Sequence, residues 1–340
     1  MKKTLVLIFS LGLVSILLSS CAKKTLKDYA AKHGVKTGVA VAVSDLNNEE
    51  HLQIIRENSS IVVAENCMKW ESVHPGKTTW NWNEVDRMIE FAEKNKIEVK
   101  WHTLFWHNQN PRFLSSLETR EQALEVMDEH ITTIMTRYKG RISEYDVVNE
   151  MFNEDGTMRE TIWYKTIGPD YIEHALIKAR ETDPNAKLFL NEYNNEEQGN
   201  KKADAMYEMV KDFVKRGIPI DGVGFQLHLA TIYPYNAVAV KSNIRRYADL
   251  GLEVSFSEVD VRMLVPPSEN SLKTQTKIYS SLAKLAKEEP NVTSFITWGF
   301  TDKQSWVPYT FTGYGDALLY NRDLKKKPVY EAVLKEFEKK

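Results

Sequence analysis

Residues 144–150 read EYDVVNE, a short run of strand character that ends in an amide and a carboxylate. Apolar residues at helical spacing lie before it, over 120–138, and after it, over 171–182. A second run of strand character follows at 187–191. A strand followed by an amphipathic helix and another strand is typical of parallel pairing, because the helix returns the chain to the same end of the sheet.

The same alternation extends outward from this stretch in both directions. It predicts eight strands, at 37–43, 60–64, 97–102, 144–149, 187–191, 222–226, 253–257 and 294–298. Amphipathic helices are predicted at 83–95, 120–138, 171–182, 201–216, 239–250 and 272–288. Eight such repeats are enough to close a barrel, so we predict an α/β fold, a single (β/α)8 TIM barrel over residues 22–340. A doubly wound open sheet is the alternative.

The charge balance limits the partners of the chain. Its 340 residues include 45 basic and 47 acidic side chains, a formal net charge of −2, and 42% apolar residues. This composition is typical of a soluble globular protein. Near-neutral charge gives no basis for binding through phosphate neutralisation, so we expect no nucleic-acid partner and an uncharged or mildly polar ligand.

Residues 1–21 have the features of an export signal rather than of a folded segment. A pair of lysines precedes an apolar run from 5 to 18, which is followed by Ser19, Ser20 and Cys21. The run is shorter than the about 20 residues that span a bilayer. Small residues before Cys21 resemble a bacterial lipoprotein signal, so we expect an exported, monomeric cell-envelope lipoprotein whose only membrane contact is a lipid on Cys21. The alternative is an ordinary secretory signal that contains a cysteine.

No motif for a common cofactor or metal is complete. Gly76, Lys77 and Thr78 resemble the end of a phosphate-binding loop, but Glu71 occupies the position of its first glycine. The chain has no G-x-G-x-x-G after a strand, no H-E-x-x-H, no paired C-x-x-C and no G-x-S-x-G. We therefore expect neither a cofactor nor a metal.

Titratable and aromatic side chains stand at or just after the ends of several predicted strands. They are His102, Glu150, Glu192, His228, Glu258 and Trp298. In a barrel of this kind the loops that follow the strands converge on one face. Buried strands ordinarily avoid acidic and imidazole groups, whose desolvation is unfavourable without partners. Their recurrence at one rim predicts a functional site.

Glu150 and Glu258 are the candidate pair for chemistry. Glu150 directly follows the fourth predicted strand, and Glu258 lies at the end of the seventh. The two are far apart in the sequence, so only the fold can bring them together. Glycoside hydrolysis needs two facing carboxyl groups, one to protonate the leaving oxygen and one to attack or to activate water. An Asn-Glu dipeptide also occurs elsewhere, for example at 191–192, so the dipeptide alone decides nothing.

Six motifs spread over nearly the whole mature chain carry a family resemblance. They are AENCMKWESVHP at 64–75, WHTLFWHNQNP at 101–111, YDVVNE at 145–150, DGVGFQLHL at 221–229, SEVDVR at 257–262 and TWGFTDKQSWVP at 297–308. With these motifs the sequence resembles the family 10 glycoside hydrolases, chiefly endo-β-1,4-xylanases. The resemblance implies an eight-stranded β/α barrel, retaining hydrolysis of β-1,4-linked xylan or xylo-oligosaccharide, and no cofactor.

The resemblance implies a different role for each glutamate. Glu150 would be the acid/base and Glu258 the nucleophile. The division agrees with elementary electrostatics, because the acid needs a raised pKa and a negative neighbour helps to keep it protonated, whereas the nucleophile must be ionised.

The resemblance also implies supporting roles next to the pair. His228 would bond Glu258, and Asp260 would orient the His228 ring from its far side. Asn149 would hold the 2-hydroxyl of the sugar, a contact that strengthens in the transition state. Gln226 would be the other amide at the nucleophile and shares a strand face with His228 if the strand is regular.

Further positions match residues that line the family's sugar-binding cleft. Glu65, Asn66 and Lys69 match the donor-side hydroxyl binders, His102 and Trp106 match residues around the sugar beside the cut, and Trp298 and Trp306 match the aromatic ceiling. Tryptophan together with amides and charges is the expected lining, since sugar rings have apolar faces and polar rims. We expect His107 and Gln109 to support the site from behind, and four tryptophans to pack in the core: Trp70, Trp80, Trp82 and Trp163.

The sequence departs from the family at two places. Lys100 and Trp101 stand where the family usually has Arg-Gly, and 191–194 reads NEYN instead of Asn-Asp-Tyr-Asn. A lysine keeps the charge but loses the planar bidentate grip of arginine. We expect the large Trp101 ring to alter the packing beneath the donor subsites.

Two other functions stay open at this point. The first is hydrolysis of another β-1,4-glycan, cellulose-like or mixed-linkage, because one pocket wall decides whether a hydroxymethyl group fits. The second is a non-catalytic, glycan-binding surface lipoprotein. Binding alone needs no second carboxylate, so the presence of both Glu150 and Glu258 favours an enzyme.

Overall fold

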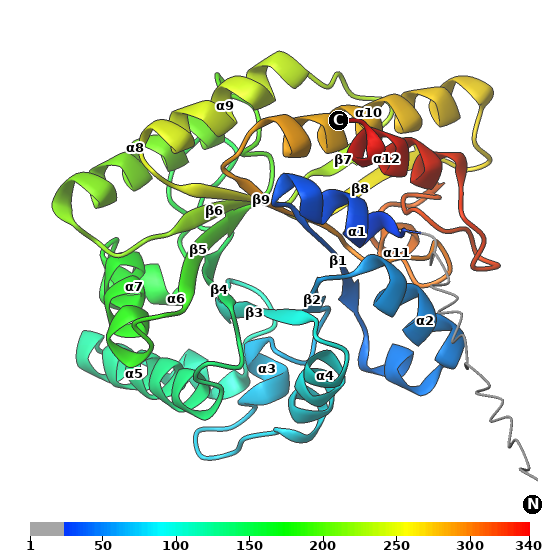
Figure 1. The fold of residues 1–340 in the computed structure, drawn as a ribbon. Helices are drawn as coiled ribbons and strands as arrows, with labels where there is room; N and C mark the ends of the chain where they lie inside the picture. Colours follow the sequence, from blue (N-terminus) through cyan, green and yellow to red (C-terminus); the bar gives the residue numbers. More distant parts are fainter. Residues whose placement is uncertain (1–23) are drawn as a thin grey trace, which may run out of the picture.

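The computed structural model describes residues 24–340. The predicted signal at 1–21 and the lipidation at Cys21 lie outside the described residues. Across 24–340 the chain forms a barrel of parallel strands with helices around it (Figure 1). In this part of the chain, no helix is long and apolar enough to cross a membrane.

Eight parallel strands form the barrel, in sequence order. They are β1 (Lys36–Val41), β2 (Ile61–Ala64), β3 (Glu98–Phe105), β4 (Glu144–Asn149), β5 (Lys187–Glu192), β6 (Gly222–Phe225), β8 (Glu253–Leu264) and β9 (Val292–Thr297). The ring closes because β9 pairs in parallel with β1, with Ile296 opposite Gly38. This closure confirms the predicted barrel and excludes the open sheet, whose first and last strands would not pair.

The helices cover the outside of the barrel (Figure 1). They are α1 (Leu26–Ala30), α2 (Glu49–Asn58), α3 (Trp70–Val73), α4 (Asn83–Lys94), α5 (Arg120–Arg137), α6 (Ile162–Ile167), α7 (Tyr171–Thr182), α8 (Lys201–Arg216), α9 (Ala237–Asp249), α10 (Glu269–Glu288), α11 (Val307–Thr310) and α12 (Pro328–Glu338). All six predicted helices are present. α2 was not predicted because its buried face contains His51 and Asn58 beside Ile55, which weakens the apolar periodicity.

Capping residues set where helices begin and end. Before α5, the backbone N–H of Gln122 donates to Oγ1 of Thr119 at 3.3 Å, and the Gln122 side chain accepts from the Thr119 N–H at 3.3 Å. This reciprocal pair satisfies two donors that the first turn leaves free. α8 ends at Gly217, whose φ of 75° is left-handed and favours glycine.

β8 is longer than predicted and continues beyond the barrel. The prediction ended at Ser257, but the strand runs to Leu264. Its outer half pairs in parallel with β7 (His228–Ala230) and antiparallel with β10 (Tyr314–Gly315). Local periodicity could not reveal this, because the two partner strands are only three and two residues long.

Trp101 does not lie beneath the donor subsites, so that expectation is wrong. Side chains alternate along a strand, and in β3 Lys100 and His102 point into the barrel. Trp101 points outward, is fully buried, and packs against Tyr138 and Tyr145 with ring centroids 5.6 and 6.2 Å away. The Trp101 side chain, which departs from the family pattern, is therefore accommodated between the barrel strands and the surrounding helices.

Candidate active site

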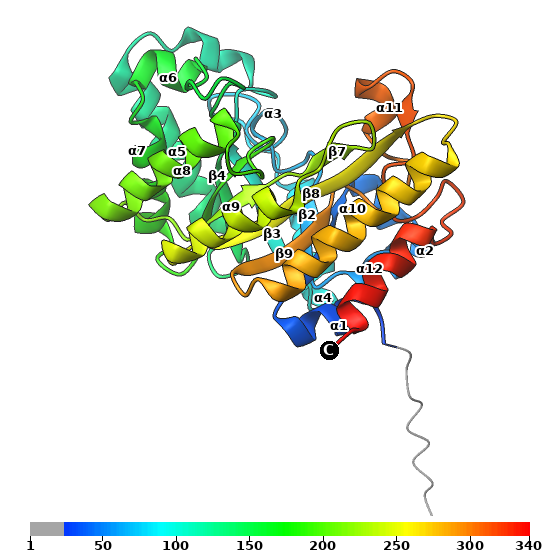
Figure 2. The same cartoon turned by 90° about the horizontal axis from the view of Figure 1, so that it is seen from above.

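A cleft of about 690 Å³ opens at the end of the barrel where the strands finish. Figure 2 shows this end, with α3, α6, α11 and β7, opposite α1 and α12. The cleft is lined by twelve of the thirteen residues predicted around the reaction: Glu65, Asn66, Lys69, His102, Trp106, Asn149, Glu150, Gln226, His228, Glu258, Trp298 and Trp306. The thirteenth, Asp260, lies behind His228. The fold thus brings together side chains from six different strand ends and their loops.

Glu258 is a buried carboxylate held by two donors. Its Oε2 is 3.0 Å from Nε2 of His228, and its Oε1 accepts from Nδ2 of Asn191 at 2.7 Å. Burial alone raises the pKa of the Glu258 carboxyl. The hydrogen bond from His228 and the positive charges of His102 and His228 outweigh burial, and they lower this pKa to about 2. Glu258 is therefore ionised at neutral pH.

His228 lies between two carboxylates. Its Nδ1 is 2.8 Å from Oδ2 of Asp260, which also accepts from Nε1 of Trp306 at 2.8 Å. Burial lowers the pKa of His228, but the charge and hydrogen bond of Asp260, together with Glu258, raise it to about 10. The ring is then an imidazolium that donates to both carboxylates, which fixes its orientation against Glu258.

The charge state of this pair predicts a pH-dependent effect on stability. The folded pKa of His228 lies above the ordinary value of 6.5, so its stabilisation is fully present below 6.5 and is lost as pH rises through about 10. The folded pKa of Glu258 lies below 4.5, so its stabilisation is present above 4.5 and is lost as pH falls toward 2. Between about pH 4.5 and pH 6.5 both contributions are fully present, and there we expect His228→Gln to lower the free energy of unfolding by about 3 kcal/mol.

Urea unfolding of the wild type and of His228→Gln from pH 5 to pH 10 measures this effect. The difference between the two is expected to shrink steadily above pH 6.5. His174→Gln, which changes a surface histidine beside Asp128, is the matched control and is expected to have little effect. A difference that stays constant up to pH 10 would contradict the imidazolium.

Glu150 occupies the turn after β4 and is less buried than Glu258. Its backbone is in the left-handed region, with φ of 56°. The backbone N–H donates to the carbonyl of Asn191 at 2.9 Å, and its own carbonyl accepts from Nε of Arg159 at 3.0 Å. These two bonds hold a conformation that is unfavourable for a residue with a side chain. They orient the Glu150 carboxyl toward Gln226, whose Nε2 donates to Oε1 at 3.2 Å.

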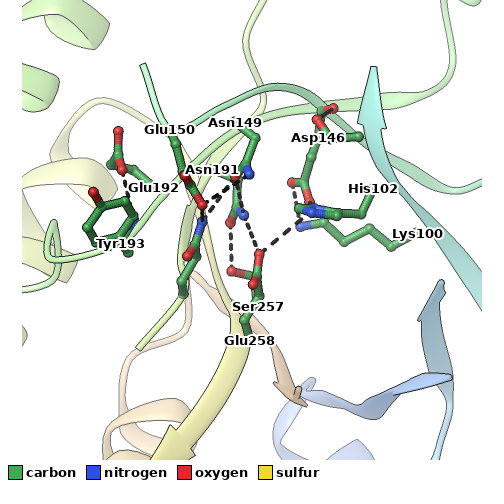
Figure 3. Close-up of polar contacts among 12 residues, drawn as sticks. Lys100, His102, Asp146, Asn149, Glu150, Asn191, Glu192, Tyr193, Ser257 and Glu258 are labelled. Atoms are coloured by element: carbon green, nitrogen blue, oxygen red, sulfur yellow. Dashed lines mark hydrogen bonds and ion pairs between the residues drawn. The ribbon is translucent and has the colours of Figure 1, made fainter. Parts of the chain in front are cut away.

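Asn191 links the two halves of the site and was not predicted to do so. Its Nδ2 donates to Glu258 at 2.7 Å and to Oδ1 of Asn149 at 2.9 Å, while its Oδ1 accepts from Ser257 at 2.6 Å (Figure 3). Because a carboxylate only accepts, Glu258 fixes the orientation of the Asn191 amide. The Asn149 oxygen must then face Asn191, which leaves its Nδ2 on the side of Glu150, 3.4 Å from Oε1.

A glycine on the neighbouring strand makes room for this amide. A Cβ at Gly224 would lie 1.9 Å from Oδ1 of Asn191. Two features of the sequence could have indicated this role of Asn191. It lies near the end of a predicted strand, and the next predicted strand begins with two glycines, Gly222 and Gly224. The role could be recognised only from the register of the two strands, which places Asn191 opposite Gly224.

A buried chain of charges lies beneath the cleft. Nζ of Lys100 is 2.9 Å from Oδ1 of Asp146, and Oδ2 of Asp146 is 3.0 Å from Nδ1 of His102 (Figure 3). That Nδ1 is also 3.8 Å from Oε1 of Glu258. Lys100 therefore provides the opposite charge that a buried aspartate requires, and Asp146 orients His102 against the nucleophile position.

Glu192, the remaining strand-end carboxylate, supports the loop after Glu150 and does not line the cleft. It accepts from the backbone N–H groups of Phe152 and Tyr193, each at 3.0 Å, and lies 3.3 Å from Nζ of Lys202. Burial raises the pKa of Glu192 to about 8, against the charge of Lys202. Two of its three partners are backbone N–H groups, those of Phe152 and Tyr193, so it positions the loop that carries Glu150.

The donor side combines one buried lysine with aromatic rings. Lys69 lies 5.0 Å from the ring centroid of Trp106 and 5.8 Å from that of Trp298, and its Nζ donates to Asn66 at 3.0 Å. Burial lowers the pKa of Lys69, although Glu258 and Glu65 oppose this. Burial likewise raises the pKa of Glu65, against the charge of Lys69. Charged donors and acceptors beside aromatic faces suit the rim and the faces of a sugar ring.

Aromatic residues outside this group are divided between core and cleft. Trp70 and Trp163 are buried in the core, as predicted, and Trp80 and Trp82 are partly buried and pack against it.

His107 and Gln109 line the cleft instead of lying behind it, as had been expected. His107 faces Glu150, with Nδ1 3.6 Å from Oε2. Six further lining residues were not predicted: Asn108, Tyr193, Asn194, Arg262, Thr310 and Phe311.

Comparison with known proteins agrees with this geometry. A model of glycosyl hydrolase family 10 matches residues 25–336. Endo-1,4-beta-xylanase B of Thermotoga neapolitana is 40% identical over 294 residues, which cover 86% of this chain and 84% of that protein. The structure of xylanase 10B from Thermotoga petrophila in complex with xylobiose superposes with a TM-score of 0.89 at 38% identity, over 92% of this chain and 97% of that one. A Gloeophyllum trabeum endo-beta-1,4-xylanase superposes at 0.88 with 32% identity, over 93% and 99%.

Proposed function

Since this chain belongs to glycosyl hydrolase family 10, we infer that it cleaves internal β-1,4-xylosidic linkages of xylan with retention of configuration, through Glu150 and Glu258. The observation that carries this assignment is the arrangement of the two carboxyl groups. They line one cleft and are connected through the amides of Asn149 and Asn191. A retaining glycosidase needs such a pair, about 5–5.5 Å apart, on either side of the scissile bond.

In the first half of the reaction, Glu258 attacks the anomeric carbon. His228 and Asn191 keep Glu258 ionised and aimed into the cleft. As the bond from Oε forms, the bond from the anomeric carbon to the glycosidic oxygen breaks, and that oxygen takes the proton of Glu150. The products are a covalent glycosyl-enzyme and a shortened chain with a new non-reducing end.

In the second half, water replaces the departed chain. Glu150, now a carboxylate, takes a proton from the water, whose oxygen attacks the anomeric carbon and releases Glu258. Two inversions give net retention. The Nδ2 of Asn149 lies on the side of Glu150, where it supports a hydrogen bond to the 2-hydroxyl that strengthens as positive charge develops on the sugar.

Xylan and carboxymethyl-cellulose distinguish this function from hydrolysis of another β-1,4-glycan. We expect new reducing ends from xylan and at least about 100-fold fewer from carboxymethyl-cellulose, because a wall that fits xylose excludes the hydroxymethyl group of glucose. Comparable release from both polymers would contradict a xylan-specific enzyme. Retention of xylan without any new reducing ends would instead favour the non-catalytic glycan-binding protein.

We also propose that the chain is exported and anchored through a lipid on Cys21. The support is the sequence of residues 1–21, with its lysine pair, short apolar run and small residues before the cysteine. In cells labelled with radioactive palmitate, we expect label on the wild-type chain and none on Cys21→Ser, with the variant lost from the membrane fraction. Cys67→Ser is the matched control, since Cys67 is buried within the described residues. Equal labelling of Cys21→Ser would contradict the anchor.

A further inference from the structure

A buried lysine lies behind the loop that carries Glu150. Lys202, in the first turn of α8, is fully buried. Its Nζ is 2.8 Å from Oε1 of Glu154 and 3.3 Å from Oε1 of Glu192, and it lies 3.4 Å from the centroid of the Tyr193 ring. Burial of an ammonium is unfavourable unless its partners offset the loss of water. These partners belong to the loop after β4 and to the end of β5, so Lys202 connects both segments to α8.

One route from Lys202 to Glu150 runs through Glu192. The Glu192 carboxyl accepts from the backbone N–H of Tyr193 through Oε1 (Figure 3) and from that of Phe152 through Oε2, each at 3.0 Å. Lys202 approaches Oε1, the oxygen that accepts from Tyr193, and this leaves Oε2 for Phe152. Because Phe152 is two residues after Glu150, the orientation of Glu192 fixes the start of the loop.

A second route runs through the side chain of Tyr193. Its ring lies against the Lys202 ammonium, and its hydroxyl accepts from Nη2 of Arg159 at 3.1 Å. The same Nη2 donates to the carbonyl of Phe152 at 3.1 Å, and Nε of Arg159 donates to the carbonyl of Glu150 at 3.0 Å. A desolvated ammonium on an aromatic face contributes about 2 kcal/mol. Lys202 therefore also holds the group that supports Arg159, one of the two donors and acceptors that fix the left-handed turn at Glu150.

Further contacts tie the middle of the same loop to α8. Oε2 of Glu154 accepts from Nδ2 of Asn194 at 3.1 Å, while Oε1 of Glu154 pairs with Lys202. Gly156 lies directly against the helix, since a Cβ there would be 2.9 Å from the carbonyl oxygen of Lys201. The loop after β4 is thus held by Lys202 at Glu154 as well as through the two routes to Phe152 and Arg159.

We propose that Lys202 is a positioning residue for the general acid, and that its buried charge holds the loop after β4 so that the Glu150 carboxyl meets the leaving oxygen. This inference rests on the proposed function. Proton transfer needs the acid within hydrogen-bond distance of that oxygen, and a displacement of about 1 Å can lower a rate by about 100-fold. Glu258 is held by His228 and Asn191 instead, so its attack on the sugar does not depend on Lys202.

Two substrates that differ only in their leaving group test this role. The phenolate of phenyl β-xylobioside needs the proton of Glu150, whereas the dinitrophenolate of dinitrophenyl β-xylobioside leaves without one. In Lys202→Met, which keeps an unbranched side chain and removes the charge, we expect kcat/KM on the phenyl glycoside to fall about 10- to 100-fold. On the dinitrophenyl glycoside we expect kcat/KM to stay within about two-fold. Lys201→Met, which changes the exposed neighbour, is the matched control and is expected to change neither.

The ratio of the two kcat/KM values distinguishes positioning from loss of folded protein, which lowers both values equally. An equal loss on both substrates, or no loss on either, overturns the role of Lys202 while hydrolysis of xylan by the wild type stands. A wild type that cleaves neither substrate refutes the proposed function and, with it, the inference.

Glu192→Gln decides the question if Lys202→Met does not fold. The Lys202 ammonium only donates, so the oxygen of the introduced amide must face it and the amide nitrogen then faces the N–H of Phe152. The bond to Phe152 is lost with little change in shape. We expect kcat/KM on the phenyl glycoside to fall about 3- to 10-fold, the size of one hydrogen bond, with the dinitrophenyl glycoside unaffected. Without such a selective loss in this variant, the positioning role is wrong.

Discussion

Replacing Glu258 by alanine is expected to lower kcat on xylan by on the order of 10⁴-fold or more, the largest effect of any single substitution in the cleft. The variant loses the oxygen that bonds to the anomeric carbon. It also leaves the buried His228 ring without one of its two carboxylates, since Oε2 of Glu258 is 3.0 Å from Nε2. Release of reducing ends from xylan measures the loss.

Azide tests the role of Glu258 directly. The space left by the carboxylate admits the anion, whose terminal nitrogen bonds to the anomeric carbon while the leaving oxygen takes the proton of Glu150. A single displacement gives the α-glycosyl azide, with inverted configuration, which NMR identifies. Glu258→Gln is the matched control, because its amide still fills the space and is expected to prevent rescue. Substantial wild-type turnover by either variant would remove Glu258 from the mechanism.

Replacing Glu150 by alanine is expected to lower kcat/KM on xylan by about 10²–10⁴-fold, the usual contribution of a positioned general acid. The sugar leaving group of xylan needs a proton, whereas dinitrophenolate leaves without one. On a dinitrophenyl β-xylobioside, the first step is therefore expected to proceed at a rate close to that of the wild type. Hydrolysis of the glycosyl-enzyme becomes slow because no base activates water.

A burst of dinitrophenolate followed by slow turnover is the signature to measure. Glu150→Gln keeps the shape of the side chain and is expected to show the same burst, because it can neither donate nor accept the proton. Glu65→Gln is the matched control, since Glu65 lines the same cleft on the donor side and is expected to show no burst. If Glu150→Ala slows both substrates equally, Glu150 only binds and is not the acid.

Most of the barrel could be predicted from local sequence. Each strand and long helix carries its own period, as in 171–182 and 187–191, where the predicted and observed elements nearly coincide. Several missed elements have a mixed burial pattern or are very short, but α12 was missed as well, although its buried residues are all apolar: Val329, Tyr330, Val333 and Phe337. α2 buries His51 and Asn58, and β7 and β10 are too short to show any period.

The residues of the cleft were predicted more completely than their connections. Family motifs identified Glu150, Glu258 and His228, and the fold places all three in one cleft. The motifs did not reveal that Asn191 connects Glu258 to Asn149, because that contact joins β4, β5 and β8 and depends on the register between them. Nor did they reveal the side of β3 on which Trp101 lies, which follows from the pairing of the strand and not from the identity of the residue.

The sequence by itself determined the eight strands of the barrel and their order, six of the helices around it, and the presence of two glutamates at strand ends, because periodicity and motifs are properties of neighbouring residues. The tertiary structure decided which groups meet. It set the amide connection through Asn191, the left-handed turn at Glu150 and the extension of β8 between β7 and β10. Each of these depends on hydrogen bonds between segments far apart in the chain, and their geometry exists only once the barrel has closed.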